Sequence, residues 1–271
     1  MRLLLARHGE SVDNVAGLYA GSRDSSLTNH GVLQAKRLGA HIAGRHAAIG
    51  PIRNLFASNL QRAYRTADAI AEACQLQSGD SASLVAPGVI RVEDLREKDF
   101  GSSEGKKFGH KESADGSESP ESMRLRIDRF LDHHLSPIIG RLAAENAAVV
   151  VVSHGIILNV LLKALLSRYL PKSPSPLIAG RSDPEYLAPW SNTGVLQIRL
   201  ERAESNASHQ LHGVKTIHCM VEYINNVDHL EGLKKTRGGI GSAKFDSRQR
   251  TMDSFFLSTS KKRKIEEAKD Q

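Results

Sequence analysis

The chain has 271 residues, of which 40% are hydrophobic and 5% aromatic, and it carries a net charge of +7. This length exceeds one average domain and falls short of two, so we expect one domain with a sizeable core and an appendage. The only cysteines, Cys74 and Cys219, exclude a disulfide framework and indicate a reducing compartment. The opening apolar run is too short for a signal sequence, and no run approaches the roughly 18 apolar residues of a membrane span, so we expect a soluble intracellular protein.

The first predicted element is a buried strand over residues 3–6 that ends in Arg7, His8, Gly9 and Glu10. Apolar residues bounded by charge and glycine are typical of an inner strand of an α/β sheet. Ligands bind at the carboxyl ends of such strands, so we expect His8 to lie in a binding site. Taken alone, a histidine in this position is more often a hydrogen-bonded structural residue.

A second strand is predicted over residues 54–57, followed by a helix for which Ser58 is a candidate N-cap. Arg62 lies in the first turn of this helix. Its planar guanidinium group suits phosphate oxygens, and the amino end of a helix adds backbone N–H groups and a favourable dipole. The alternative is a solvated surface charge.

The charged segment 92–101 has no helical spacing of apolar residues and places Glu97 shortly before Phe100 and Gly101. Release of a phosphoryl group from an alkoxide needs a proton donor, and a partly buried carboxyl group can supply the proton near neutral pH. We therefore expect Glu97 to act as the acid. A glutamate in a charged run is otherwise ordinarily solvated.

Helices are predicted over residues 125–142 and 156–166, and a β-branched strand over 148–152 lies between them and delivers His154 and Gly155. Two histidines that follow parallel strands reach the same edge of a sheet and can face one pocket. The pair points to phosphoryl transfer through histidine.

The late part of the domain is predicted to add two strands. A Pro/Ser-rich loop precedes a strand over residues 194–200, which we expect at the edge of the sheet. An alternating strand is expected over 211–221. His209, His212, His218 and Cys219 fall in or beside this strand, and without a second ligand pair we expect no metal there.

Together these residues resemble the histidine phosphatase superfamily, the phosphoglycerate mutase-like enzymes, in its branch 1. The resemblance covers about the first 200 residues, and its motifs follow in the order that the family uses. It implies a three-layer αβα fold with a mostly parallel sheet flanked by helices. The matching motifs are Arg7-His8-Gly9-Glu10-Ser11, Asn14, Tyr19 to Asp24, Leu27-Thr28, Gly31, Ser58 to Ala67, Leu95-Arg96-Glu97, Phe100-Gly101, Glu104-Gly105, Pro120-Glu121-Ser122, Ser153-His154-Gly155 and Asn192-Thr193.

The resemblance implies that His8 is the nucleophile that becomes phosphohistidine, and that Glu97 protonates the leaving oxygen and then activates water. Arg7, Arg62 and His154 are implied to clamp the phosphoryl oxygens, which requires no metal or cofactor. Further substrate contacts are implied for Asn14, Ala20, Gly21 and Gly155.

The acceptor of the phosphoryl group distinguishes phosphatases from mutases within this family. The segment 105–121 is short, polar and rich in serine and glycine, whereas mutases that retain a bisphosphate typically carry a longer ordered insertion. An open lid favours water as the acceptor, so we expect a phosphatase that acts on a phosphomonoester, preferably a small molecule. Phosphoglycerate mutase-type transfer and a sugar bisphosphatase are the alternatives.

The residues from Lys234 onward carry +6 of the net charge of +7, so the preceding part of the chain is almost neutral. The polar, glycine-rich composition of this segment predicts disorder, and we place a catalytic domain at 1–232 and a disordered tail at 233–271. A basic tail can contact polyanions, but direct binding to nucleic acid is not the favoured interpretation.

The tail contains an apolar motif, Gln249-Arg250-Thr251-Met252-Asp253-Ser254-Phe255-Phe256. It resembles the box by which proteins bind the replication sliding clamp, which has a glutamine, two residues, an aliphatic residue, two residues and two aromatic residues. A single turn would group Met252, Phe255 and Phe256 as a plug for an apolar pocket and leave Gln249 free to hydrogen-bond. Alternatively, the phenylalanines dock back on the domain, or the match arose by chance.

The basic cluster 261–264 resembles a nuclear import signal, so we expect the protein in both the cytoplasm and the nucleus. Two classes of function are therefore open. One is a histidine phosphatase with a targeting tail, and the other is a catalytically silent scaffold that binds the clamp. A silent scaffold should have lost a catalytic residue, and this chain keeps all five, so the enzyme is favoured.

Overall fold

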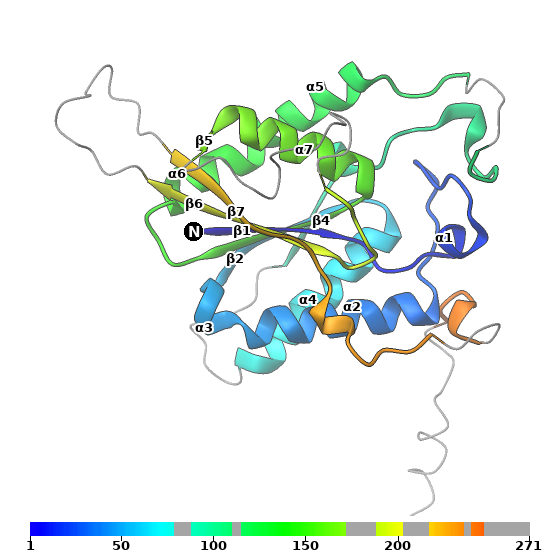
Figure 1. Cartoon of the computed structure of the whole chain (residues 1–271), viewed down its shortest axis with the longest axis horizontal. Coiled ribbons are helices and arrows are strands. Elements are labelled where there is room, and N and C mark those ends of the chain that lie inside the picture. The colour runs from blue at the N-terminus through cyan, green and yellow to red at the C-terminus, as the bar shows by residue number, and fades with distance from the viewer. Residues whose placement is uncertain (79–87, 110–114, 172–187, 203–216, 236–239, 247–271) are drawn as a thin grey trace, which may run out of the picture.

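The computed structural model of the chain describes residues 1–78, 88–109, 115–171, 188–202, 217–235 and 240–246. Within these residues a seven-stranded sheet lies between two layers of helices, in the order β3-β2-β4-β1-β6-β7-β5 (Figure 1). The strands are β1 (Arg2–Arg7), β2 (Ile52–Ser58), β3 (Val89–Val92), β4 (Ala148–Ser153), β5 (Leu170–Pro171), β6 (Val195–Arg202) and β7 (Ile217–Asn226).

The helices cover both faces of this sheet. In Figure 1, α2, α3 and α4 lie below the sheet and α5, α6 and α7 lie above it. The α-helices are α1 (Val12–Ala16), α2 (Asn29–Gly44), α3 (His46–Ile49), α4 (Gln61–Ser78), α5 (Pro120–Phe130), α6 (Ser136–Leu142) and α7 (Gly155–Arg168). A π-helical turn, Leu131–Leu135, joins α5 to α6, and short 3₁₀ turns occupy Glu93–Leu95, Gly101–Ser103, Asp228–Leu230 and Ile240–Ser242.

Two hydrophobic cores result from the period-two alternation of the central strands. On β1, Leu3 and Leu5 face the core under α5 to α7, whereas Leu4 and Ala6 face the core under α2 to α4. All six residues of β4 are buried. Strands covered on both faces are expected to be almost continuously apolar, which is the pattern that the sequence displays.

The sheet is mixed and mostly parallel. β1, β2, β3 and β4 run parallel to one another, whereas β6 is antiparallel to both β1 and β7. The predicted three-layer α/β fold is therefore confirmed. The four parallel strands all deliver their carboxyl ends to one edge, which is where ligands bind in such sheets.

Two local predictions were wrong. The late strand β6 lies inside the sheet between β1 and β7, because β7 adds a further antiparallel strand beyond it. Helix α4 begins at Gln61, and Ser58 instead ends β2. The cap comes from a distant loop, since the Gln61 N–H donates to Asp24 Oδ1 over 2.6 Å. A local capping rule cannot detect such a partner.

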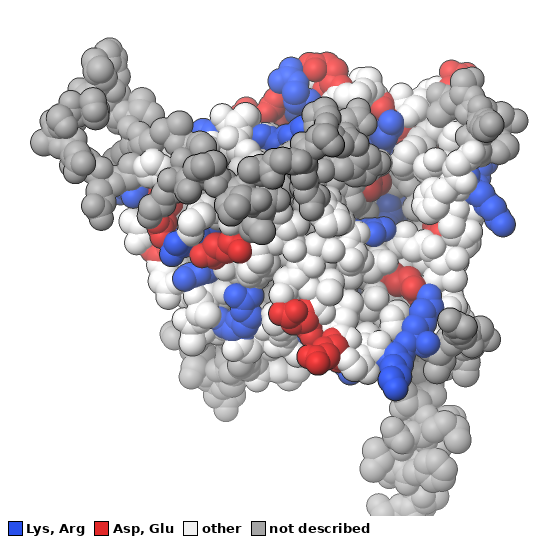
Figure 2. Space-filling model, viewed as in Figure 1, with Lys and Arg blue, Asp and Glu red and all other residues white. Residues whose placement is uncertain are grey.

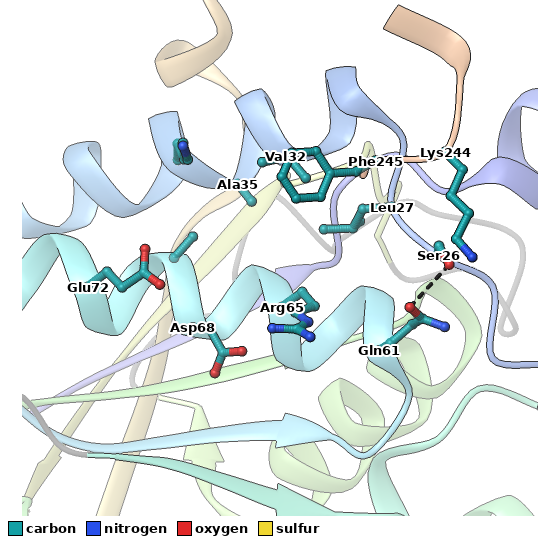
Figure 3. Close-up of a pocket in the computed structure, with 12 residues that line it drawn as sticks. Ser26, Leu27, Val32, Ala35, Gln61, Arg65, Asp68, Glu72, Lys244 and Phe245 are labelled. Atoms are coloured by element: carbon teal, nitrogen blue, oxygen red, sulfur yellow. Dashed lines mark hydrogen bonds between the residues drawn. The ribbon is translucent and has the colours of Figure 1, made fainter. Parts of the chain in front are cut away.

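Part of the predicted tail packs on the domain. Residues 240–246, here called the C-terminal strap, run beside the start of α2. The Asn29 N–H donates to the Ala243 carbonyl (3.0 Å), and the Phe245 N–H donates to the Leu27 carbonyl (3.1 Å). The Phe245 ring lies against Leu27 and Val32 at a cavity of about 410 Å³ between α2 and α4 (Figure 3). The packed body thus extends past residue 232.

The domain boundary at residue 232 and the disorder of the tail outside residues 240–246 stay predictions. The clamp-like motif 249–256 and the basic cluster 261–264 lie outside the described residues. Among the helices of the described ranges, none combines the length and hydropathy that a membrane-spanning segment needs.

Candidate active site

His8 lies directly after β1, and only 3% of its surface is exposed. Its Nδ1 lies 2.7 Å from the carbonyl oxygen of Gly9. Because a carbonyl can only accept a hydrogen bond, Nδ1 carries the proton and Nε2 keeps its lone pair. Burial, followed by the charges of Arg62 and Arg7, lowers the pKa of His8 well below 6.5. The ring is therefore neutral at physiological pH, which is its nucleophilic form.

His154 follows β4 and lies immediately before α7. Since β4 is the parallel neighbour of β1, the rings of His8 and His154 come within 5.0 Å, tilted by 60°. Burial, followed by the charge of Arg62, lowers the pKa of His154 well below 6.5. Neither ring nitrogen of His154 has a hydrogen-bond partner among the described residues. Buried polar atoms are normally paired, so these nitrogens are suited to a ligand oxygen.

Arg7 and Arg62 bring positive charge to the same place. The Nη groups of Arg62 donate to the carbonyls of Gly21 and Arg23, both over 2.7 Å, and Arg7 Nη1 donates to the Trp190 carbonyl over 2.6 Å. Burial lowers the pKa of both guanidinium groups, that of Arg62 to about 10, so both stay protonated at neutral pH. The Nε atoms of both arginines lack a partner within the described part of the chain. A site with these donors attracts an anion.

Glu97 lies at the start of α7, beside His154. Its two carboxylate oxygens accept hydrogen bonds from the N–H groups of Ile156 (3.2 Å) and Ile157 (3.1 Å). Burial lowers the pKa of the two site arginines, and the negative charge of Glu97 opposes that effect in each of them. Glu97 therefore lies within electrostatic reach of both guanidinium groups.

Ala20 and Gly21 belong to a loop that closes over Arg62. Gly21 has a positive φ of 50°, and a Cβ at this position would overlap the Glu104 carboxylate. Glu104 Oε1 accepts from the Ser22 N–H over 2.6 Å, and Oε2 accepts from the Ser22 hydroxyl over 3.0 Å. Hydrogen bonds from Ser22 to Glu104 and from Arg62 to two backbone carbonyls thus hold the loop in place.

Asn14 joins the site through Asn192. Asn192 Nδ2 donates both to the His8 carbonyl (3.1 Å) and to Asn14 Oδ1 (3.2 Å). Gly155 is the first residue of α7 and directly follows His154. The nine residues that the sequence predicts for catalysis and substrate binding thus lie around the ends of the parallel strands. Gln249, Met252, Phe255 and Phe256, predicted to bind a partner, lie outside the described residues.

Several polar side chains that shape the site were not predicted. Arg126 could have been found, because it lies on the core-facing stripe of α5 with Met123, Ile127 and Phe130. A charged residue on such a stripe signals a specific partner. Asp24 and Glu104 fall within the family motifs, but their contacts with Gln61 and Ser22 have no local signal because those partners are distant in the chain. Glu118 pairs with Arg126, eight residues further along.

The described residues contain no group of three or more His, Cys, Asp or Glu side chains arranged to hold a metal ion. His209 and His212 lie outside those residues. Acidic and basic side chains are interspersed on the face of the domain that Figure 2 displays. This mixture agrees with the small net charge of the chain before Lys234.

Proteins of similar sequence include phosphatases. A protein of Schizosaccharomyces pombe named "Probable phosphatase C1620.13" is 32% identical over 263 residues, which are 93% of this chain and 78% of that protein. Phosphoserine phosphatase 1 of Hydrogenobacter thermophilus is 33% identical over 180 residues, covering 64% of this chain and 79% of that protein.

Solved structures share the fold. A mycobacterial glucosyl-3-phosphoglycerate phosphatase in complex with VO3 has a TM-score of 0.60 at 22% identity, covering 83% of this chain and 98% of that one. A phosphoglycerate mutase from Bacillus anthracis has a TM-score of 0.57 at 20% identity, covering 85% of this chain and 95% of that one. The model of the histidine phosphatase superfamily (branch 1) matches residues 3–177. The chain therefore belongs to the histidine phosphatase superfamily, branch 1.

Proposed function

We propose that this protein is a phosphatase that hydrolyses a phosphomonoester through a phosphohistidine at His8. The observation that carries the proposal is the state of the His8 ring, which is neutral, with Nδ1 committed to the Gly9 carbonyl and Nε2 unprotonated. A histidine held in one tautomer is a competent nucleophile.

The reaction has two displacements. The Nε2 lone pair forms a bond to phosphorus while the bond from phosphorus to the leaving oxygen breaks, and the Glu97 carboxyl group passes a proton to that oxygen. Water then attacks phosphorus, Glu97 takes up a proton from the water, and the N–P bond breaks. Inorganic phosphate leaves, and both His8 and Glu97 return to their starting states.

The guanidinium groups of Arg7 and Arg62 would stabilise the negative charge on the phosphoryl oxygens. Arg7 and Arg62 stay protonated, and their buried positions strengthen their attraction for the equatorial oxygens. A His154 ring nitrogen would accompany them as a polar contact. Because two guanidinium groups supply this charge, we expect no metal ion and no cofactor to be needed.

Water as the acceptor separates this proposal from its closest alternatives. The segment 105–121 is short and polar, and the relatives with phosphatase names support hydrolysis. Phosphoglycerate mutase-type transfer is the second candidate. It is favoured by a relative of Erwinia tasmaniensis named "Probable phosphoglycerate mutase GpmB", 32% identical over 179 residues, which are 61% of this chain and 75% of that protein.

A sugar bisphosphatase is a further candidate within the same chemistry. The fish relative "Fructose-2,6-bisphosphatase TIGAR B" of Danio rerio is 28% identical over 275 residues, covering 86% of this chain and 98% of that protein. All three candidates use the same nucleophile, and they differ in the molecule that docks beside it.

The test is turnover of an aryl phosphate in excess chelator, comparing the intact chain with His8→Ala. Hydrolysis that resists the chelator and disappears in the folded variant would support the proposal. Equal rates for the two proteins, or activity that requires an added divalent cation, would overturn it. A screen of phosphoserine, phosphoglycerates and sugar bisphosphates then separates the phosphatase from its alternatives, because a mutase yields an isomer and no free phosphate.

We further propose that the tail directs the enzyme to the replication sliding clamp through Gln249, Met252, Phe255 and Phe256, and that the cluster 261–264 takes it to the nucleus as well as the cytoplasm. Titration of the purified clamp into the full chain tests the first part. We expect binding that Phe255→Ala with Phe256→Ala removes. Binding without any catalytic activity would favour the silent scaffold.

A further inference from the structure

We propose that Arg126, paired with Glu118, is a positioning residue that holds the Glu97 segment in the orientation required for proton transfer. The catalytic part of this inference rests on the proposed function. The geometric part rests on contacts of Arg126 alone, which is 4% exposed although it carries a charge.

Arg126 binds the main chain on both sides of Glu97. Its Nη1 donates to the carbonyls of Asp94 and Arg96, both over 2.6 Å, and its Nη2 donates to the Glu97 carbonyl over 3.2 Å. One rigid guanidinium group therefore ties three carbonyls of a four-residue segment. A lysine has a single nitrogen and cannot reproduce this fork.

Glu118 completes the arrangement from the other side. It receives Nε (2.8 Å) and Nη2 (3.0 Å) of Arg126 in a two-point ion pair. The backbone N–H of Glu118 donates to the Asp99 carbonyl over 2.8 Å, so Glu118 also contacts the segment that follows Glu97. Burial raises the pKa of Glu118, but the bond and charge of Arg126 outweigh burial and leave the pKa lowered. Glu118 is thus held in its charged form beside the Arg126 guanidinium group.

Packing alone does not explain an arginine at this position. The other core-facing residues of α5 are apolar, including Met123, Ile127 and Phe130. Replacing a buried ion pair by apolar side chains is often neutral or stabilising, so its presence is weak evidence of a stabilising role. Fixing the direction of a reactive side chain is a different requirement, and it depends on hydrogen-bond geometry.

The position of the Glu97 carboxylate depends on two anchors. At one end Arg126 holds the backbone, and at the other the carboxylate reaches the N–H groups of Ile156 and Ile157. A general acid must lie within hydrogen-bond reach of the leaving oxygen, and a displacement of about 1 Å is costly for rate. Loss of Arg126 should therefore impair proton donation more than substrate binding.

The first test uses a series of phosphomonoesters whose leaving groups range from a nitrophenol to an alkyl alcohol. For Arg126→Lys we expect kcat to fall about 3-fold with the nitrophenol and about 100-fold with the alkyl alcohol, with KM changed less than about 3-fold, because only the poor leaving group needs the acid. Glu97→Gln should give the same pattern. Arg124→Lys is the control, since Arg124 lies on the same helix with 58% of its side chain exposed.

The second test needs no activity. Amide hydrogen exchange of Ile156 and Ile157 in the full chain reports whether Glu97 still holds them. We expect at least about 10-fold faster exchange at these two amides in Arg126→Lys and no change in Arg124→Lys. If Arg126→Lys does not fold, Glu118→Gln provides the same comparison.

The two results separate two failures. A wild-type chain without phosphatase activity would overturn the proposed function, while the exchange measurement would still decide the role of Arg126. An equal loss of kcat for every leaving group, or unchanged exchange at Ile156 and Ile157 in folded variants, would overturn the role of Arg126.

Discussion

The rings of His8 and His154 lie 5.0 Å apart although each belongs to a different βα unit. The pairing of β1 with β4 produces this contact, because Arg7 lies opposite Ser153 and a histidine directly follows each strand. Both rings are neutral, since burial and the neighbouring arginines lower their pKa values well below 6.5. In the proposed mechanism, one ring acts as the nucleophile and the other contacts the phosphoryl group.

His154→Asn should lower kcat/KM for an aryl phosphate by about 10²- to 10³-fold, the usual cost of removing one group that stabilises charge in the transition state. Because neither ring nitrogen of His154 has a partner among the described residues, the folded state should lose little stability. Steady-state kinetics and thermal unfolding measure the two effects. A variant with normal kcat/KM would exclude His154 from the phosphoryl site.

Acid should destabilise the protein through its buried histidines. Burial, followed by the charge of His41, lowers the pKa of His229 to about 4, whereas an unfolded histidine titrates near 6.5. Between these values the unfolded state binds more protons than the folded state, so the free energy of unfolding decreases as pH falls below about 6.5. His8 and His154 act in the same direction.

The contribution of His229 can be isolated with His229→Gln, whose side chain can still reach the Thr193 hydroxyl that lies 2.9 Å from His229 Nε2. We expect the loss of stability between pH 6.5 and 5.5 to be smaller in the variant by up to about 1 kcal/mol. Urea unfolding at several pH values measures this difference. Parallel pH profiles for the two proteins would contradict the expectation.

Gly21→Ala and Gly17→Ala form a matched pair. Both glycines have positive φ, 50° and 64°, so alanine is strained at either position by about 1–2 kcal/mol. A Cβ on Gly17 has no heavy atom within 4 Å, but on Gly21 it would overlap the Glu104 carboxylate. Gly21→Ala should therefore displace the loop that binds Arg62 and lower kcat/KM at least about 10-fold beyond Gly17→Ala. Equal activity of the two variants would contradict this.

The C-terminal strap should contribute to stability. Phe245→Ala removes the ring that packs on Leu27 and Val32 (Figure 3), and since the ring is 42% exposed we expect a loss of about 1 kcal/mol. Leu76→Ala is the control, because Leu76 is 85% exposed on α4. Urea unfolding of the full chain measures both. An unchanged unfolding curve for Phe245→Ala would mean that the strap does not pack in solution.

The ends of β1 and β4 could be predicted because neighbouring residues in the sequence define them. A short apolar run followed by charge and glycine defines β1 and β4, and the histidine after each then falls at the ligand edge by topology. Glu97 was predicted from the charged segment before Phe100 and Gly101, but its place at the start of α7 depends on backbone donors from another segment. The sequence alone could not reveal those donors.

The rest of the site depends on contacts between segments that no periodicity links. Asp24 caps α4 from a loop, and Arg126 binds carbonyls that lie 29 to 32 residues before it in the chain. The strap was predicted to be disordered from its polar, glycine-rich composition, yet two backbone hydrogen bonds and Phe245 fix residues 240–246 on the domain. The average composition of a segment does not reveal that a single aromatic residue, here Phe245, packs on the domain.

The central position of β1 also governs how the protein is made. β1 is synthesised before both of its neighbours in the sheet, which are residues 148–153 and 195–202. Until both have been synthesised, Leu3, Leu4 and Leu5 have no complete sheet to join, and His8 has no fixed place. A nascent chain that stalls before β6 thus leaves one side of β1 without its sheet neighbour, and the surroundings of His8 can form only after residue 202 has been added.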